Sequence, residues 1–332
     1  MLLKLILASI LCASACSFGQ VSLPSGEHQA TINGVKLWFK VAGQERRGEP
    51  PVLFLHGGPG YNSYSFEKTI GAQLEAHVQM VYLDERGSGR SERPVNRDYT
   101  MTTLVQDVEA LRRSLGIQRL SLMGHSFGGT IALEYASRYP EHVAKLIILD
   151  GAADMPATFA LWAKQIEQRY PAEWHSTLNS PTGETLQRAE ASHIDCAIAK
   201  AEFSAEMATL KKADFQAFHD WQQFHSQGPL RQQKAIDQAS GLRNTGEISS
   251  VYFGEDIGFP CYRFIAFARL TMPVLVIVGR YDGAIGVEQM RTLATHLPNA
   301  RFDEFADSGH FTYAEQPQKF VQDVTSFLAL SR

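Results

Sequence analysis

The sequence has no block of like charges. Its 31 lysines and arginines are also nearly balanced by 35 aspartates and glutamates over 332 residues. Proteins that bind nucleic acids or anionic membrane surfaces concentrate positive charge, so a net charge of −4 argues against both kinds of partner. The motifs H-E-x-x-H, G-x-x-x-x-G-K-[ST] and G-x-G-x-x-G are also absent. We therefore expect no metal, no organic cofactor, and a small molecule as the partner.

The sequence offers no apolar run long enough to cross a bilayer, which takes about 20 residues. A shorter apolar run, residues 5–13, follows Lys4 and ends in A-S-A, which fits a signal-peptidase cleavage site. These features predict a secretory signal peptide over residues 1–15, with residue 20 as its outer limit, and a protein exported to the periplasm or the extracellular space. Cys16 follows directly, so a lipid anchor at Cys16 is an alternative form of the exported chain.

Cysteine is scarce, with four residues in the chain. Cys12 lies in the predicted signal peptide and Cys16 at its edge, which leaves Cys196 and Cys261 in the mature protein. In an exported protein such a pair can form a disulfide, and two buried, unpaired thiols are the alternative. Nothing in the sequence places a catalytic partner beside either cysteine, so neither is predicted to be a nucleophile.

Strand and helix patterns alternate along most of the chain. Asn33-Gly34 lies between residues 30–32 and 35–41 and predicts a β-hairpin. Apolar runs typical of buried parallel strands follow at residues 52–55, 78–83, 120–123, 146–149 and 274–278, and helical spacing occurs at residues 104–115, 131–139 and 316–330. This alternation predicts an α/β fold, with a mostly parallel central sheet flanked by helices.

The alternation breaks after Asp150. Helix-forming residues, tryptophan and glutamine dominate the next hundred or so residues, so the sequence predicts an inserted helical cap over residues 152–268. The predicted α/β domain then comprises residues 28–150 and 270–330.

Residues 124–128 read G-H-S-F-G and match the pattern G-x-S-x-G. The motif follows a predicted strand and precedes a predicted helix, which is the context in which this turn presents a nucleophilic serine. We therefore predict Ser126 as the nucleophile.

A serine hydroxyl needs a neighbouring base, and in this arrangement the acid and the histidine follow the serine along the chain. Asp282 comes just after the strand at residues 274–278, and His310 follows another predicted strand at residues 301–305. Carboxyl ends of parallel strands gather functional groups at one edge of a sheet, so we predict His310 as general base and Asp282 as its orienting acid. His125 is a rival base, but its position next to Ser126 points it away, and we interpret it as a packing residue.

Attack on a carbonyl also needs hydrogen-bond donors for the developing oxyanion. The N–H of the residue after the nucleophile, Phe127, is the first predicted donor. Residues 56–60 (H-G-G-P-G) follow a predicted strand, and their glycines let the backbone turn the N–H of Gly58 toward the site.

Three motifs together resemble the proline iminopeptidase family of α/β-hydrolases: residues 56–60, residues 84–91 (D-E-R-G-S-G-R-S) and residues 279–282 (G-R-Y-D). The resemblance covers the predicted α/β domain. It implies an α/β-hydrolase fold and a serine exopeptidase that removes an N-terminal residue, often proline, from short peptides. It also implies that Ser126, Asp282, His310 and Gly58 have the roles given above and that residues 84–91 form a packed loop near the site.

The chain departs from this family in the residues that are expected to contact the substrate. Many members have a tryptophan where this chain has Phe127, and members bind the substrate amine with cap carboxylates that do not align here. The candidates are Glu202, Glu206, Glu247, Glu255 and Asp256, although each is more typical of a solvated surface charge.

Two other functions follow from the same residues. A carboxylesterase or lactonase would use the same chemistry on small esters, because one hydrolase fold serves many substrates. A non-catalytic binding protein is the third hypothesis, and the complete set of Ser126, Asp282 and His310 argues against it.

Overall fold

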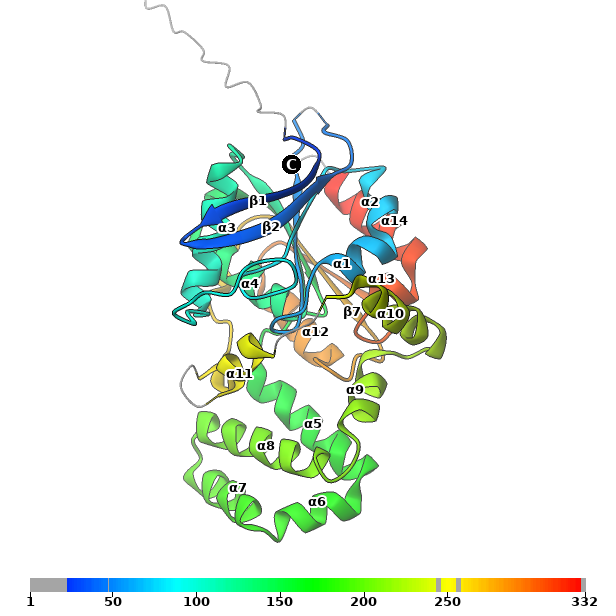
Figure 1. Ribbon diagram of the computed structural model, residues 1–332. Coiled ribbons are helices and arrows are strands. Elements are labelled where there is room, and N and C mark those ends of the chain that lie inside the picture. The colour runs from blue at the N-terminus through cyan, green and yellow to red at the C-terminus, as the bar shows by residue number, and fades with distance from the viewer. Residues whose placement is uncertain (1–22, 47, 243–245, 255–257, 330–332) are drawn as a thin grey trace, which may run out of the picture.

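A computed structural model describes residues 23–46, 48–242, 246–254 and 258–329, in which eight strands form one sheet (Figure 1). The predicted signal peptide, with Cys12 and Cys16, lies outside these residues. The strand order is β1-β2-β4-β3-β5-β6-β7-β8, in which β1, β2 and β4 pair antiparallel and the remaining pairs are parallel. The strands are β1 (Gly26–Ile32), β2 (Val35–Ala42), β3 (Val52–Leu55), β4 (Met80–Leu83), β5 (Leu120–His125), β6 (Val143–Leu149), β7 (Val274–Gly279) and β8 (Ala300–Phe305). The predicted α/β-hydrolase fold with a mostly parallel sheet is confirmed.

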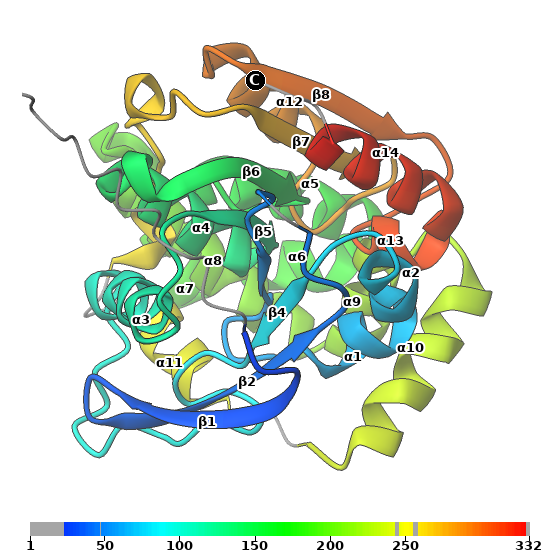
Figure 2. The ribbon, with the colours of Figure 1, turned by 90° about the horizontal axis from the view of Figure 1, so that it is seen from above.

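Helices cover both faces of the sheet, which is why its central strands are apolar throughout. Successive side chains point to opposite faces, so Leu53 and Leu55 of β3 join one core cluster while Val52 and Phe54 join the other. The first face is covered by α3 (Met101–Ser114), α4 (Phe127–Arg138) and α12 (Val287–His296) (Figure 2). The second is covered by α1 (Tyr64–Phe66), α2 (Ala72–Glu75), α13 (Thr312–Glu315) and α14 (Pro317–Ala329).

The cap helices lie between β6 and β7 in the sequence and cover the carboxyl ends of the strands, away from the β1–β2 hairpin (Figure 1). They are α5 (Met155–Arg169), α6 (Pro171–Leu178), α7 (Pro181–Ser192), α8 (Asp195–Leu210), α9 (Phe215–Gln223), α10 (Gln227–Ser240) and α11 (Glu247–Phe253). A small apolar core of their own, which includes Ile166, Trp174 and Phe218, holds α5–α9 together, whereas Leu230 of α10 and Ile248 of α11 pack into the two cores of the α/β domain. None of the described helices is both long enough and apolar enough to cross a membrane.

Cys196 and Cys261 form a disulfide that joins the first turn of α8 to the 3-10 turn Phe259–Cys261. This result decides between the two alternatives that the sequence leaves open. The bond closes a loop with a sequence separation of 65 residues and ties the cap to the segment that returns to β7.

Removing this disulfide with the double substitution Cys196→Ser and Cys261→Ser is expected to lower the free energy of unfolding by about 2–4 kcal/mol, because the unfolded chain regains the freedom of the loop. Urea denaturation of both proteins measures the difference. Wild-type protein with its disulfide reduced and alkylated provides the matched control. A change within about 0.5 kcal/mol, the size expected of ordinary surface substitutions, would show that the disulfide does not support the cap.

Candidate active site

Ser126 lies in a strained turn between the last residue of β5 and the first residue of α4, with φ +53° and ψ −119°. A side chain at Gly124 would put its Cβ 2.3 Å from the Gly128 carbonyl oxygen, and one at Gly128 would lie 2.2 Å from the Leu55 carbonyl oxygen. Only glycine fits at both positions. The backbone therefore makes the sharp strand-to-helix turn that the sequence predicts, with the serine at its tip.

The structure brings His310 and Asp282 together from the ends of β8 and β7. The His310 Nδ1 lies 3.1 Å from Asp282 Oδ2, and the backbone N–H groups of Ala284 and Ile285 donate to Asp282 Oδ1 at 2.8 and 3.0 Å. Both side chains are buried. With Nδ1 engaged by the carboxylate, Nε2 is the ring nitrogen left to exchange a proton with a hydroxyl or a leaving group.

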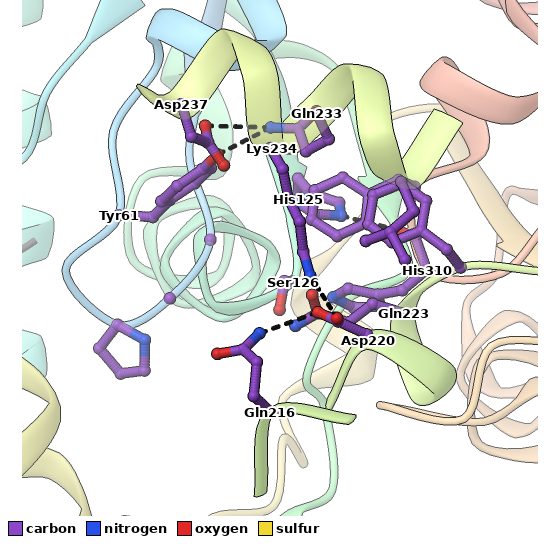
Figure 3. Close-up of a pocket in the computed structure, with 16 residues that line it drawn as sticks. Tyr61, His125, Ser126, Gln216, Asp220, Gln223, Gln233, Lys234, Asp237 and His310 are labelled. Atoms are coloured by element: carbon purple, nitrogen blue, oxygen red, sulfur yellow. Dashed lines mark hydrogen bonds and ion pairs between the residues drawn. The ribbon is translucent and has the colours of Figure 1, made fainter. Parts of the chain in front are cut away.

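Ser126 and His310 line two cavities at once. The polar pocket, of about 250 Å³, is lined by Tyr61, Gln216, Asp220, Gln233, Lys234 and Asp237 in addition to these two residues (Figure 3). The apolar pocket, of about 80 Å³, is lined instead by Phe127, Met155, Trp162, Phe253, Phe259 and Ile285. A reacting carbonyl at Ser126 would therefore have a polar space on one side and an apolar space on the other.

His125 also borders the polar pocket, but its hydrogen bond gives it a different role. The His125 Nε2 lies 2.9 Å from the His310 carbonyl oxygen and must donate to it. Burial, together with the neighbouring His310, lowers the pKa of His125 to about 3, so the ring is neutral. It holds the backbone of His310 in place, in agreement with its interpretation as a packing residue.

The residues predicted to form the oxyanion hole lie beside Ser126. Gly58 has φ +123°, which favours glycine, and it lines both pockets. Gly57 packs so closely that a Cβ there would lie 2.9 Å from the Ser126 Cβ. Phe127 is the first residue of α4, where a backbone N–H has no partner within the helix. Its ring packs edge-on against Tyr252 and Phe259 beside the apolar pocket.

A second buried carboxyl, Asp150, lies next to the His310–Asp282 pair, and the sequence analysis did not identify it. It follows β6 directly and has φ +46°. Its Oδ1 accepts the Gly279 N–H at 2.9 Å and its Oδ2 accepts the Thr312 hydroxyl at 3.2 Å. Burial and the nearby charge of Asp282 raise the pKa of Asp150 well above its usual value. Ionisation of Asp150 beside a second buried carboxyl, Asp282, is therefore disfavoured.

One group of side chains in the described part of the chain could hold a metal ion. It consists of Asp150, Asp282 and His310. Backbone N–H groups and the Asp282–His310 bond already engage their ligand atoms. This arrangement fits proton transfer better than metal coordination.

Of the cap carboxylates named from the sequence, the three that the structure describes, Glu202, Glu206 and Glu247, line neither pocket. Glu206 is fully buried, so its interpretation as a surface charge is wrong; burial and the charge of Glu202 raise its pKa well above the usual value. Glu247 pairs with Arg97 at 3.2 Å. Glu255 and Asp256 lie outside the described residues.

Two carboxylates that the sequence analysis missed line the polar pocket instead, Asp220 on α9 and Asp237 on α10. Asp220 forms an ion pair with Lys234 and accepts the Gln216 amide at 2.8 Å. Asp237 has no cation among its described partners: Tyr61, Ser65 and Gln233 all donate to its Oδ1. Burial and the charge of Asp237 raise the pKa of the Tyr61 phenol above its usual value, so this hydroxyl remains a donor.

Comparisons with known proteins agree with this geometry. Residues 50–195 match the α/β-hydrolase fold family. The chain is 28% identical over 315 residues to a cis-3-alkyl-4-alkyloxetan-2-one decarboxylase of Shewanella oneidensis, covering 92% of this chain and 89% of that protein. It is 26% identical over 293 residues to a proline iminopeptidase of Heyndrickxia coagulans, covering 86% and 92%. A proline iminopeptidase-related protein of Thermus thermophilus superposes with a TM-score of 0.71 at 22% identity, covering 92% of this chain and 98% of that one.

The fold and these matches define the chain as an α/β-hydrolase. Several of the proteins that it resembles over most of their length are proline iminopeptidases, at 24–26% identity, and these matches support the resemblance that the sequence motifs indicate. Because relatives of similar identity carry different activities in their names, the reaction has to be argued from the site.

Proposed function

We propose that the protein is a serine hydrolase that works through an acyl-enzyme. Ser126 attacks the substrate carbonyl carbon while His310 takes the hydroxyl proton at Nε2. Asp282 holds the ring in the correct tautomer and stabilises the imidazolium that forms. The Nδ1–Oδ2 bond and the two backbone N–H groups on Asp282 support these roles, since they fix the carboxyl group against the His310 ring.

The same groups complete the reaction. The carbonyl oxygen becomes negative as the tetrahedral intermediate forms, and the N–H groups of Gly58 and Phe127 stabilise it. His310 then gives its proton to the leaving group, the bond from carbon to the leaving group breaks, and the leaving group departs with the proton. Water, deprotonated by His310, attacks the acyl-enzyme and releases the acid and Ser126.

The leading substrate is a short peptide with a free N-terminal amine, so the enzyme is an aminopeptidase. One observation carries this proposal: Asp237 borders the pocket that Ser126 lines and has no cation among its described partners. Three donors hold one oxygen of this carboxylate in place, and an ammonium group is its complement. The resemblance to proline iminopeptidases gives the same substrate class.

The apolar pocket favours a second candidate, an esterase or lactonase. Among the residues that line it none is acidic, and aromatic and aliphatic side chains form most of its wall. Such a pocket binds an apolar acyl group without help from a charged anchor. Ester cleavage also demands less of His310, because an alkoxide can leave more easily than an unprotonated amine, which would have to depart as an amide anion.

Substituting Asp237 by asparagine separates the two candidates. For an aminopeptidase, Asp237→Asn is expected to lower kcat/KM on prolyl and alanyl nitroanilides by about 10- to 100-fold, the value of a hydrogen bond to a charged group. Amine-blocked anilides and nitrophenyl acetate should respond little, because they bring no ammonium group.

The charge-matched control is Asp323→Asn on α14, which removes one negative charge from a residue that pairs with Lys319 and lines neither pocket. Equal losses on nitrophenyl acetate and on free-amine anilides would contradict an amine-binding role for Asp237. Ester turnover by the wild type without any anilide cleavage would favour the esterase.

We also propose that the protein acts outside the cytoplasm. The disulfide between Cys196 and Cys261 supports this proposal, because disulfides persist in oxidising compartments. Fractionation of cells that express the full chain, followed by mass analysis of the mature N-terminus, would reveal cleavage near residue 15 and any lipid on Cys16.

A further inference from the structure

A buried pair, His56 and Glu85, lies behind the predicted oxyanion loop. His56 directly follows β3 and Glu85 comes two residues after β4, and these parallel strands place Leu55 opposite Leu83. The exposed fractions are only 1% for His56 and 3% for Glu85. The reaction described above uses neither side chain.

The hydrogen bonds of His56 define where its ring proton lies. Its Nδ1 is 2.9 Å from the Gly57 carbonyl oxygen, which can only accept, so Nδ1 carries the hydrogen. Its Nε2 accepts the backbone N–H of Glu85 at 3.2 Å, so Nε2 presents a lone pair. The ring is therefore neutral, and burial accordingly lowers the pKa of His56 below its usual value.

The same geometry indicates that Glu85 is protonated. Its Oε1 accepts the backbone N–H of His56 at 3.1 Å, while its Oε2 lies 3.0 Å from the His56 Nε2 and accepts no hydrogen bond from the described residues. The lone pairs of an ionised Oε2 and of Nε2 would repel at this distance, whereas a proton on Oε2 allows an O–H···N hydrogen bond that shares the Nε2 lone pair with the Glu85 N–H. Burial, together with the charge of Asp84, raises the pKa of Glu85 well above its usual value.

No neighbouring cation compensates an ionised Glu85 in the described part of the chain. The titratable and charged groups that interact with the pair are Asp84, Arg90, His125 and Tyr252, and Arg86 follows Glu85 in the sequence. Arg90 pairs with Asp84, and Arg86 pairs with Asp107. Burial opposes ionisation of Asp84 too, but Arg90 outweighs it and keeps the pKa of Asp84 below its usual value.

We propose that Glu85, as a neutral acid, is a positioning residue that holds residues 56–58 against Ser126 and so aims the Gly58 N–H at the oxyanion. The close packing of Gly57 on Ser126 means that a shift of His56 moves this donor relative to the nucleophile. Loss of the Oε2 proton at alkaline pH breaks the bond to His56 and releases the loop. The inference rests on the catalytic roles assigned under the proposed function, but not on the choice between peptide and ester.

Two substitutions test this role with nitrophenyl acetate as substrate and a fluorophosphonate titration to count active sites. Glu85→Gln keeps both bonds, because its amide can accept from the His56 N–H and donate to Nε2, so kcat at neutral pH should stay within about three-fold of the wild-type value. The amide cannot ionise, so the variant should also stay active at alkaline pH where the wild type declines. Glu85→Leu should lose about 10- to 100-fold in kcat, with KM nearly unchanged.

Wild-type labelling and ester hydrolysis test the proposed function separately, so a failure confined to the variants would overturn only the positioning role. That role is wrong if folded Glu85→Leu keeps wild-type kcat, or if Glu85→Gln is as impaired as Glu85→Leu. Should Glu85→Leu not fold, the alkaline profile of Glu85→Gln decides alone. Nitrogen-15 NMR gives a readout independent of activity: a neutral His56 with its proton on Nδ1 supports the role, and an imidazolium overturns it.

Discussion

Replacing Ser126 by alanine is expected to lower kcat by about 10⁴-fold or more on every substrate that the wild type cleaves, since no other group in the site can form the acyl-enzyme. The fold should persist, because the strained turn depends on Gly124 and Gly128 rather than on the serine hydroxyl. Steady-state kinetics on nitroanilides and nitrophenyl esters measure the loss, and thermal unfolding checks the fold. A small residual rate is expected from the oxyanion donors alone.

The matched control is Ser137→Ala on α4, which removes a hydroxyl whose one hydrogen bond to the described residues goes to the Glu134 carbonyl of the same helix. This variant should keep wild-type kcat. If Ser126→Ala keeps more than about a tenth of the activity, far above what removal of a nucleophile leaves, then the nucleophile is another residue.

The second large effect is expected for Asp282→Asn, which should lower kcat by about 10⁴-fold. The amide cannot stabilise the imidazolium, and the Ala284 and Ile285 N–H groups would hold its oxygen and turn its NH₂ toward His310. The ring would then be forced into the tautomer that places its proton on Nε2. The kcat of both proteins on one ester, from about pH 5 to about pH 9, checks this expectation.

Asp150→Asn is the informative control, because this carboxyl is buried within the same group of side chains. Burial and the charge of Asp282 raise the pKa of Asp150, so an amide of the same shape, which is neutral like a protonated carboxyl, should cost little in kcat. Comparable losses in the two variants would mean that the carboxyls share the catalytic charge. A larger loss for Asp150→Asn would transfer the role of orienting acid from Asp282 to Asp150.

Most of the α/β fold could be predicted from local signals. The Asn33-Gly34 turn and the short apolar runs are decided by neighbouring residues, and the structure confirms the hairpin and the strands they predicted. The first and last residues of the strands were predicted less accurately. The strand β6 begins at Val143 rather than at residue 146, because Lys145 interrupts the apolar run whereas pairing with β5 uses only the backbone.

The residues that line the polar pocket could not be predicted from local signals. Asp220 and Asp237 reach the polar pocket because α9 and α10 return beside Ser126, and their contacts span up to 176 residues of sequence. Asp150 and Glu206 look like ordinary surface acids until the sheet and the cap bury them. Burial and long-range pairing decide these roles, and neither leaves a local pattern.

The most direct test of the account is covalent labelling of the purified mature protein with a fluorophosphonate, followed by peptide mapping. The proposed mechanism requires one adduct, on the peptide that contains Ser126, and its loss in both Ser126→Ala and His310→Ala. An unlabelled wild type, or an adduct on a different serine, would contradict the claim that Ser126 is an activated nucleophile.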